Sequence, residues 1–300
     1  MIRLPDGVNI HNLIDDLRVL SWEACEILLF YSQKIKDSKN KSEIIKSQSV
    51  QDPVTVADLE VNDLIINRIK QKYKDICWTI LSEENAKNNF DSFNKNFDWI
   101  WVLDPLDGTK DFIQGTGNYA MHLALNYKNK PFIGFVLIPE RDELWISNGE
   151  KSWCERKNGS LKNSKMSRKN HIKDMNIVTS KNHRNNTLNK LIEKLNVKDV
   201  IVMGSIGCKV ASILRGESDI YISLSIPGKS APKDWDFAAP EAILKTAGGE
   251  ISTLKNEELS YCKLKFEQRG VIVASNDYLN HKDICMKVTE TIKKYDLNDF

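Results

Sequence analysis

The chain has 300 residues, of which 41% are hydrophobic and 28% charged, and its formal net charge is +2. This length and composition are those of a globular protein with one large domain or two apposed halves. The near balance of 43 basic and 41 acidic residues argues against a nucleic-acid scaffold or a polybasic membrane binder. No apolar leader, membrane-spanning apolar window or Cys-x-x-Cys pair is found, so the sequence predicts a cytoplasmic protein with reduced thiols.

The first half predicts two helices and a set of antiparallel strands. Apolar residues from Leu13 to Tyr31 recur at steps of three and four, which predicts an amphipathic helix. Residues 34–51 are charged without regular apolar spacing and predict a helix end and an exposed loop. A second helix opens at Thr55-x-x-Asp58. Strands are predicted at residues 78–81, 99–103, 119–127, 131–138 and 143–147, and the third alternates as a half-buried antiparallel strand does.

The second half has a different rhythm, in which strand-like runs alternate with helical segments. This alternation predicts a layered α/β half. Asp236 is a candidate N-cap of a helix that starts near Phe237 and ends at Gly248-Gly249. We expect an α+β half at residues 1–170 and an α/β half at residues 171–300. The predicted strands are 177–180, 200–203, 220–223 and 270–274, and the predicted helices are 188–195, 208–215, 237–247 and 282–294.

The strongest chemical signal follows the apolar strand at residues 99–103. The strand runs directly into Asp104-Pro-Leu-Asp107-Gly-Thr, in which two carboxylates lie three residues apart. We expect Asp104, the Leu106 carbonyl and Asp107 to converge on one point. Hard oxygen ligands at this spacing suit Mg²⁺.

Gly108 and Thr109 are expected to begin a short helix whose free N–H groups face a phosphate. For Asp-x-x-Asp-Gly alone, a tight turn with no ligand is the better interpretation. The whole string after an apolar strand favours the metal site instead.

This string and four further segments resemble the inositol monophosphatase family, whose signature is a Trp-rich strand ending in Asp-Pro-hydrophobic-Asp-Gly-Thr. The matches occur in order over residues 50–275, and their combination is far more specific than any single motif. The resemblance implies a layered αβαβα sandwich and a magnesium-dependent phosphatase. The four further segments are Pro53-Val-Thr-Val-Ala-Asp58, Ser82-Glu83-Glu84, Gly204-Ser-Ile-Gly207-Cys-Lys209 and Trp235-Asp236-Phe-Ala-Ala.

The resemblance also implies a ligand set for two Mg²⁺ ions, with a third and weaker ion near Glu83 in some family members. Glu83, Asp104 and the Leu106 carbonyl would hold one ion. Asp104 would bridge to a second ion held by Asp107 and Asp236. Without the resemblance, Glu83 and its neighbour would be interpreted as a solvated acidic turn.

A catalytic pair is implied in the same way. Asp58 and Thr109 would orient and deprotonate the attacking water. From the sequence alone, Asp58 is equally well interpreted as the capping-box partner of Thr55.

The substrate is expected to be a small phosphate ester. Ser180-Lys-Asn-His183 and the pair Gly207 and Lys209 resemble the 3′(2′),5′-bisphosphate nucleotidase branch, in which such residues contact the nucleotide and its second phosphate. Lys233 is an additional candidate contact, although a solvated loop explains it as well. The resemblance therefore implies hydrolysis of adenosine 3′,5′-bisphosphate to AMP, with substrate contacts from Gly108, Thr109, His183, Gly207, Lys209 and Lys233.

Two alternatives stay open at this point. The same chemistry would serve an inositol monophosphatase or a sugar bisphosphatase, and a catalytically inactive metal or nucleotide sensor would keep the same fold. The branch implies lithium sensitivity and a role in sulfur metabolism, and relatives are often dimers.

Overall fold

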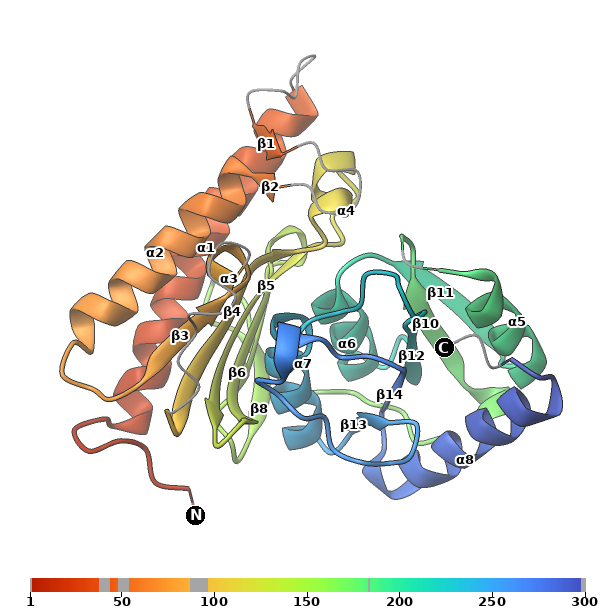
Figure 1. The fold of residues 1–300 in the computed structure, drawn as a ribbon. Helices are drawn as coiled ribbons and strands as arrows, with labels where there is room; N and C mark the ends of the chain where they lie inside the picture. Colours follow the sequence, from red (N-terminus) through yellow and green to blue (C-terminus); the bar gives the residue numbers. More distant parts are fainter. Residues whose placement is uncertain (1, 38–43, 48–53, 87–96, 183, 298–300) are drawn as a thin grey trace.

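Two sheets and three helical layers alternate through the molecule (Figure 1). The structure, a computed structural model, describes residues 2–37, 44–47, 54–86, 97–182 and 184–297. Helices α1 and α2 cover the outer face of one sheet, α6 and α7 fill the space between the sheets, and α5 and α8 cover the far face of the other. This stacking is the predicted layered αβαβα sandwich. The helices are α1 (Ile10–Asp37), α2 (Val56–Lys72), α3 (Glu83–Ala86), α4 (Thr109–Gln114), α5 (Asn186–Leu195), α6 (Ile206–Leu214), α7 (Asp234–Thr246) and α8 (Tyr278–Lys294).

The first sheet has seven strands in the chain order β3 to β9. Strands β3 and β4 are parallel, and every later pair is antiparallel. The sequence predicted the first five of these strands and missed β8 and β9, which are short and carry little apolar pattern. The strands are β3 (Thr79–Ser82), β4 (Trp99–Asp107), β5 (Ala120–Tyr127), β6 (Lys130–Ile138), β7 (Glu143–Ser147), β8 (Ser152–Glu155) and β9 (Leu161–Lys162).

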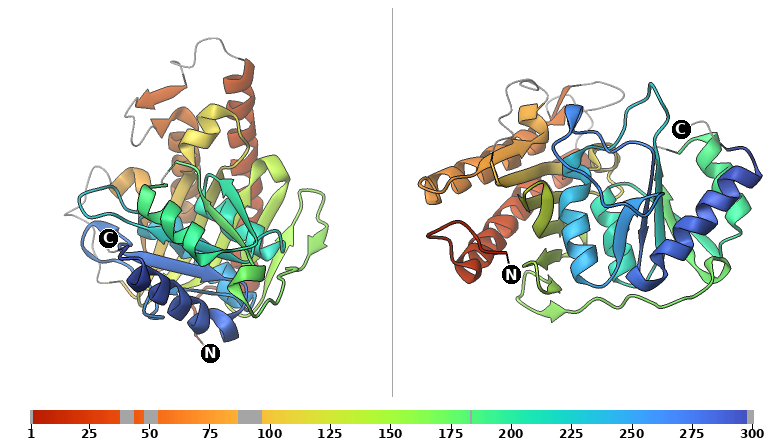
Figure 2. Two further views of the ribbon diagram at one scale, coloured as in Figure 1. Left: turned by 90° about the vertical axis from the view of Figure 1, so that its right-hand side faces the viewer. Right: turned by 60° about the horizontal axis from the view of Figure 1, so that its bottom comes forward.

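The second sheet has five strands in the order β11-β10-β12-β14-β13. Strand β10 is parallel to both β11 and β12, whereas β14 runs antiparallel to β12 and β13. The turned views in Figure 2 show α5 and α8 side by side on one face of this sheet. The strands are β10 (Asn176–Ser180), β11 (Asp199–Met203), β12 (Ile220–Leu224), β13 (Glu250–Thr253) and β14 (Val271–Ser275).

The segment that joins the two sheets lies between β9 and β10, where the sequence placed the boundary between the halves. Helix α7 packs on both sheets, so the two halves share one core. The division into residues 1–170 and 171–300 therefore stays a prediction. A two-stranded ribbon pairs β1 (Ile45–Ser47) with β2 (Val54–Thr55); β1 lies in the region predicted as a loop, and β2 directly precedes α2. Short 3₁₀ helices are η3 (Pro139–Arg141), η4 (Ile172–Asp174) and η5 (Leu264–Phe266).

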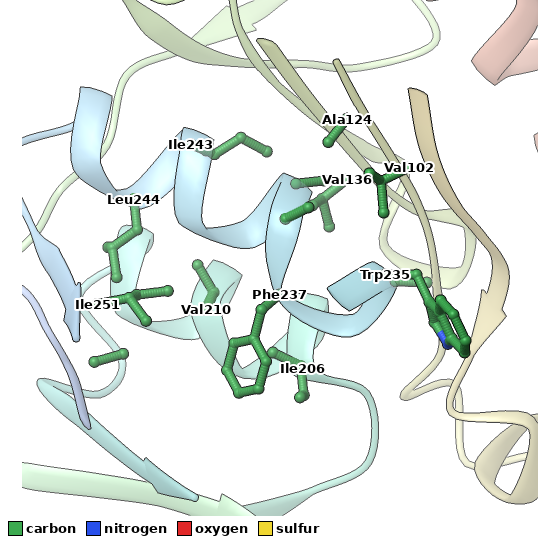
Figure 3. Packing of buried hydrophobic residues seen from close by; sticks show 14 of the residues in the cluster. Val102, Ala124, Val136, Ile206, Val210, Trp235, Phe237, Ile243, Leu244 and Ile251 are labelled. Carbon is green, nitrogen blue, oxygen red and sulfur yellow. The ribbon is translucent and has the colours of Figure 1, made fainter. Parts of the chain in front are cut away.

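Strand β5 is buried on both faces, so the prediction of a half-buried strand was wrong. Met121 and Leu123 pack towards α1 and α2, whereas Ala120 and Ala124 face α7. The reason is the close approach of α7, which the neighbouring strand β6 permits at Gly134. A Cβ atom there would lie 2.8 Å from the Ala239 carbonyl oxygen. Figure 3 shows the resulting contact layer, formed by Val102, Ala124, Val136, Ile206, Val210, Trp235, Phe237, Ile243, Leu244 and Ile251.

Two helix starts matter for the site. Helix α2 begins after Thr55 with the predicted capping box. Helix α7 begins at Asp234, earlier than predicted, and its N-cap is Lys233. Asp236 is therefore the third helical residue rather than the N-cap, and its carboxylate accepts the Lys233 N–H. Among the described residues, no helix has the length and apolar character needed to cross a membrane.

Candidate metal centre

The end of β4 carries the two aspartates of the central motif. The strand extends to Asp107, further than predicted, and its register with β5 shifts between Asp104 and Asp107. Such an irregularity re-aims the side chains at a strand end, as β-bulges commonly do beside active sites. The Leu106 N–H donates to Asp104 Oδ1 at 3.0 Å, which fixes the turn between the two carboxylates.

Asp236 on α7 completes a cluster with these two aspartates. Ligand oxygens of Asp104, Asp107 and Asp236 all lie within 4.8 Å of one another. Burial, and then repulsion from neighbouring carboxylates, raises the pKa values of Asp104 and Asp236 well above their usual range. Carboxylates crowded into a buried site are a donor set that fits Mg²⁺, because the cation would offset their repulsion.

Glu83 lies beside Asp104, and Asp58 lies near Glu83. Glu83 is the first residue of α3, and its carboxyl group shares a hydrogen bond with Asp104. Burial raises the pKa of Asp58 to about 8, and the negative charge of Glu83 adds to the shift. Asp58 Oδ2 accepts hydrogen bonds from both the N–H and the hydroxyl of Thr55. The capping-box interpretation of Asp58 is thus confirmed, and it is compatible with a second role.

The turn after Asp107 begins the predicted short helix. Gly108 adopts φ 88°, and a Cβ atom there would lie 2.9 Å from the Asn118 carbonyl oxygen, so glycine is needed. Thr109 starts α4, and its hydroxyl donates to the Leu106 carbonyl at 3.0 Å. The Leu106 carbonyl and Thr109 therefore lie together beside the carboxylates.

Helix α6 contributes an unexpected set of donors to Asp107. Asp107 Oδ2 accepts from the Ser205 hydroxyl at 2.7 Å, from the Ile206 N–H, and from the Gly207 N–H at 3.2 Å. His122, on β5, is fully buried, and its Nε2 lies 3.3 Å from the same oxygen. Burial lowers the His122 pKa, while Asp107 opposes that shift.

The predicted substrate residues differ in placement. Gly207 lies beside Asp107, but Lys209 is buried and its ammonium group donates to the Gly204 and Ser205 carbonyls at 3.0 and 2.9 Å. In this structure the Lys209 side chain thus bonds the turn before its own helix, whereas the sequence predicted a contact with a substrate phosphate. The Lys233 ammonium group forms an ion pair with Glu267 at 3.1 Å. His183 lies outside the described residues.

Sequence reasoning missed two residues that contact the site, His122 and Ser205, and a third, Asp111, that lies beside the turn preceding Ser205. His122 stands directly opposite Asp104 in the β4–β5 register, and a lone histidine in an apolar strand was its only signal. Ser205 lay within a recognised motif, but nothing in the sequence connected it to Asp107. Asp111, on α4, is buried beside Gly204 and accepts from Thr116 Oγ1 at 2.7 Å and from Asn182 Nδ2 at 2.8 Å.

The chain is similar to known proteins along most of its length. Residues 12–293 match the model of the inositol monophosphatase family. The 3′(2′),5′-bisphosphate nucleotidase CysQ of Buchnera aphidicola is 30% identical over 79% of this chain and 82% of its own length. A 3′(2′),5′-bisphosphate nucleotidase of Dictyostelium discoideum is 30% identical over 77% of this chain and 84% of its own length.

Solved structures show the same fold. An inositol monophosphatase of Thermotoga maritima has a TM-score of 0.70 at 20% identity, and the match covers 94% of this chain and 99% of that one. Inositol monophosphatase II of Staphylococcus aureus has a TM-score of 0.71 at 21% identity, with 95% and 96% covered.

The family match and the cluster of three carboxylates identify a metal-dependent phosphatase. Because the family match spans most of its length, the chain belongs to the inositol monophosphatase family.

Proposed function

We propose that the protein hydrolyses the 3′-phosphate of adenosine 3′,5′-bisphosphate to give AMP and inorganic phosphate. The observation that carries the substrate class is the similarity to bisphosphate nucleotidases over more than three quarters of the chain. The observation that carries the reaction is the cluster of buried Asp104 with the partly buried Asp107 and Asp236.

The cofactor in this proposal is Mg²⁺, with two or three ions per site. Glu83, Asp104, the Leu106 carbonyl, Asp107 and Asp236 would hold these ions. When bound, Mg²⁺ lowers the pKa of a coordinated water molecule and neutralises negative charge on the phosphoryl oxygens.

The catalytic pair remains Asp58 and Thr109. Thr55 occupies Asp58 Oδ2, so Asp58 Oδ1 is the oxygen available to take a proton from the attacking water. The Thr109 hydroxyl donates a hydrogen bond to the Leu106 carbonyl, so the lone pairs of the hydroxyl oxygen can accept a hydrogen bond from that water and orient it. Water oxygen then bonds to phosphorus, the ester P–O bond breaks, and the 3′-oxygen leaves and takes up a proton.

Substrate contacts are proposed at both halves of the site. Gly108 and Thr109 offer backbone N–H groups, and Gly207 allows close approach of the ligand. Lys233 would contact the second phosphate after exchanging Glu267 for it, and His183 would contact the nucleotide. Lys209 enters this scheme through the loop that it holds, rather than as a direct ligand.

A substrate panel tests the proposal. Phosphate release with Mg²⁺ is measured on adenosine 3′,5′-bisphosphate, inositol 1-phosphate and fructose 1,6-bisphosphate. We expect the highest kcat/KM on the nucleotide. A higher value on either other ester would instead assign the inositol monophosphatase or sugar bisphosphatase alternative, and no turnover of any ester would favour the inactive sensor.

The same resemblance supports further expectations. We propose inhibition by Li⁺, a role in removing a by-product of sulfate activation, a cytoplasmic location and a homodimer. Phosphate release assayed with increasing Li⁺ at fixed Mg²⁺ tests the first of these, and unchanged activity would reject it.

A further inference from the structure

The three donors on Asp107 come from the second half of the chain and meet at one atom. The Ser205 hydroxyl and the N–H groups of Ile206 and Gly207 all bond Oδ2. These contacts therefore leave Oδ1 as the oxygen that can serve another partner. The Ser205 hydroxyl, at 2.7 Å, is the only side-chain group among the three donors.

The turn that presents Ser205 is held against backbone strain. Ser205 has φ 38°, a conformation that residues other than glycine rarely adopt and that costs free energy. The ammonium group of Lys209 stabilises this turn by donating hydrogen bonds to the backbone carbonyls of Gly204 and Ser205. The Ser205 hydroxyl also caps α6 by accepting from the Cys208 N–H at 3.1 Å.

Two glycines allow this turn to approach the first half so closely. A Cβ atom at Gly204 would lie 2.3 Å from Asp111 Oδ2, and one at Gly207 would lie 2.2 Å from His122 Nε2. An ordinary helix start needs neither glycine. Their presence indicates that the segment is shaped for contact with the carboxylate cluster.

We propose that Ser205 is a positioning residue for the metal ligand Asp107. By bonding Oδ2, its hydroxyl holds the carboxylate in one orientation, so that the remaining oxygen stays with Asp104 and Asp236. The inference rests on the proposed metal site. Removal of such a supporting hydrogen bond typically weakens metal binding about 10- to 100-fold.

Metal binding by the metal-free protein is the direct test. Mg²⁺ and Mn²⁺ are titrated into wild type, Ser205→Ala and Ser205→Gly, and the metal concentration giving half of the maximal rise in Tm is compared, with calorimetric titration of Mn²⁺ as a second measurement. Ser205→Gly removes the hydroxyl and also relieves the strained φ, so it provides a folded variant if Ser205→Ala is unstable. We expect both variants to need at least about tenfold more metal.

Ser212→Ala is the matched control. Ser212 is a buried serine of the same helix that bonds the Lys209 carbonyl and Ser218, not Asp107. We expect it to lower Tm without changing the half-saturating metal concentration. Equal weakening in Ser212→Ala and the Ser205 variants would overturn the proposal, since the effect would then be general destabilisation.

Asp107→Asn separates failure of the inference from failure of the proposed function. If Asp107→Asn weakens metal binding and the Ser205 variants bind metal like wild type, only the positioning role is overturned. If Asp107→Asn itself binds metal like wild type, the metal site is wrong and the inference falls with it.

Discussion

At the residue scale, Asp104 lies where its negative charge destabilises the folded protein, and in the proposed function that charge binds metal. It is 1% exposed and crowded by Glu83, Asp107 and Asp236. Asp104→Asn keeps the shape and removes the repulsion. We therefore expect the metal-free variant to have a higher Tm than wild type while its turnover with Mg²⁺ falls by at least about 100-fold. Thermal unfolding in EDTA and phosphate release check the two effects, and retained turnover would contradict the two-metal scheme.

A second residue-scale prediction concerns His281, which lies away from the metal centre on α8. Its two ring nitrogens bond the Ser252 and Ser275 hydroxyls, and burial lowers its pKa to about 4. The unfolded chain, with an ordinary histidine pKa, binds the proton first as pH falls. Stability is therefore complete above about pH 6.5 and is lost towards pH 4, with about 2 kcal/mol lost at pH 5.

Urea unfolding at pH 7.5 and pH 5 measures this contribution. His281→Gln should be less stable than wild type at pH 7.5 but lose less stability on acidification. An equal loss in both proteins would show that other groups carry the pH dependence.

At this scale, sequence reasoning identified the carboxylates better than their supports. Asp104 and Asp107 follow an apolar strand within a dense motif, so their proximity was predictable. Ser205 and His122 meet Asp107 only through tertiary packing, which no local pattern records. Lys209 illustrates the converse, because a lysine in a recognised motif was expected to face the ligand and instead bonds backbone carbonyls.

At the element scale, the contact between β6 and α7 controls where Asp236 lies. Gly134→Ala would place a methyl group 2.8 Å from the Ala239 carbonyl oxygen and 2.9 Å from the Ala242 Cβ. Overpacking of this kind costs about 1–3 kcal/mol and would push α7 away from the sheet. We expect lower stability in urea together with weaker metal binding, because Asp236 moves with α7.

Gly159→Ala serves as its control. Gly159 has φ 79°, so backbone strain should destabilise the alanine variant by about 1–2 kcal/mol. Its Cβ atom would meet open space and contact no other residue. We expect lost stability with unchanged metal affinity. Normal metal affinity in Gly134→Ala as well would disprove the link between the packing of α7 and the site.

The same contact explains which elements were predictable. Periodicity identified most helices and long strands because it depends on residues close in sequence. It failed for β5, whose alternation indicated one buried face, since α7 covers the other face from more than a hundred residues away along the chain. Strands β8 and β9 are too short for a pattern to emerge.

At the scale of the whole molecule, we expect a bound metal ion to link two layers of the fold and so to stabilise it. Asp104 and Asp107 belong to β4 in the first sheet, whereas Asp236 belongs to the central helix α7. A ligand that binds only the folded state stabilises it, by about 2.7 kcal/mol at 100 times its Kd. We expect Mg²⁺ to raise Tm and EDTA to reverse the rise.

The pH dependence of this stabilisation has a defined sign. The raised pKa values of Asp104 and Asp236 mean that metal must displace protons, so metal affinity should increase with pH. Titrations of Tm against Mg²⁺ at pH 6 and pH 8 measure it. Tighter binding at pH 6 would contradict the assignment of these carboxylates as ligands.

The stacking of the layers was predictable only through the family resemblance. Local patterns predicted an α+β half followed by an α/β half, which is correct in sequence order. They did not indicate that α6 and α7 lie between the two sheets, because the choice of face is made by packing across the whole chain.

The central position of α7 also determines the order in which parts of the fold can form during synthesis of the chain. The last strand of the first sheet ends at Lys162, so this sheet leaves the ribosome before Asp234, where α7 begins. Until then the part of its inner face that α7 covers in the folded protein, at Ala124, is exposed and is a surface that chaperones can bind. The nascent chain also lacks Asp236. We therefore expect metal binding to be one of the last steps of maturation, and a chain truncated before α7 to aggregate rather than accumulate as a partly active enzyme.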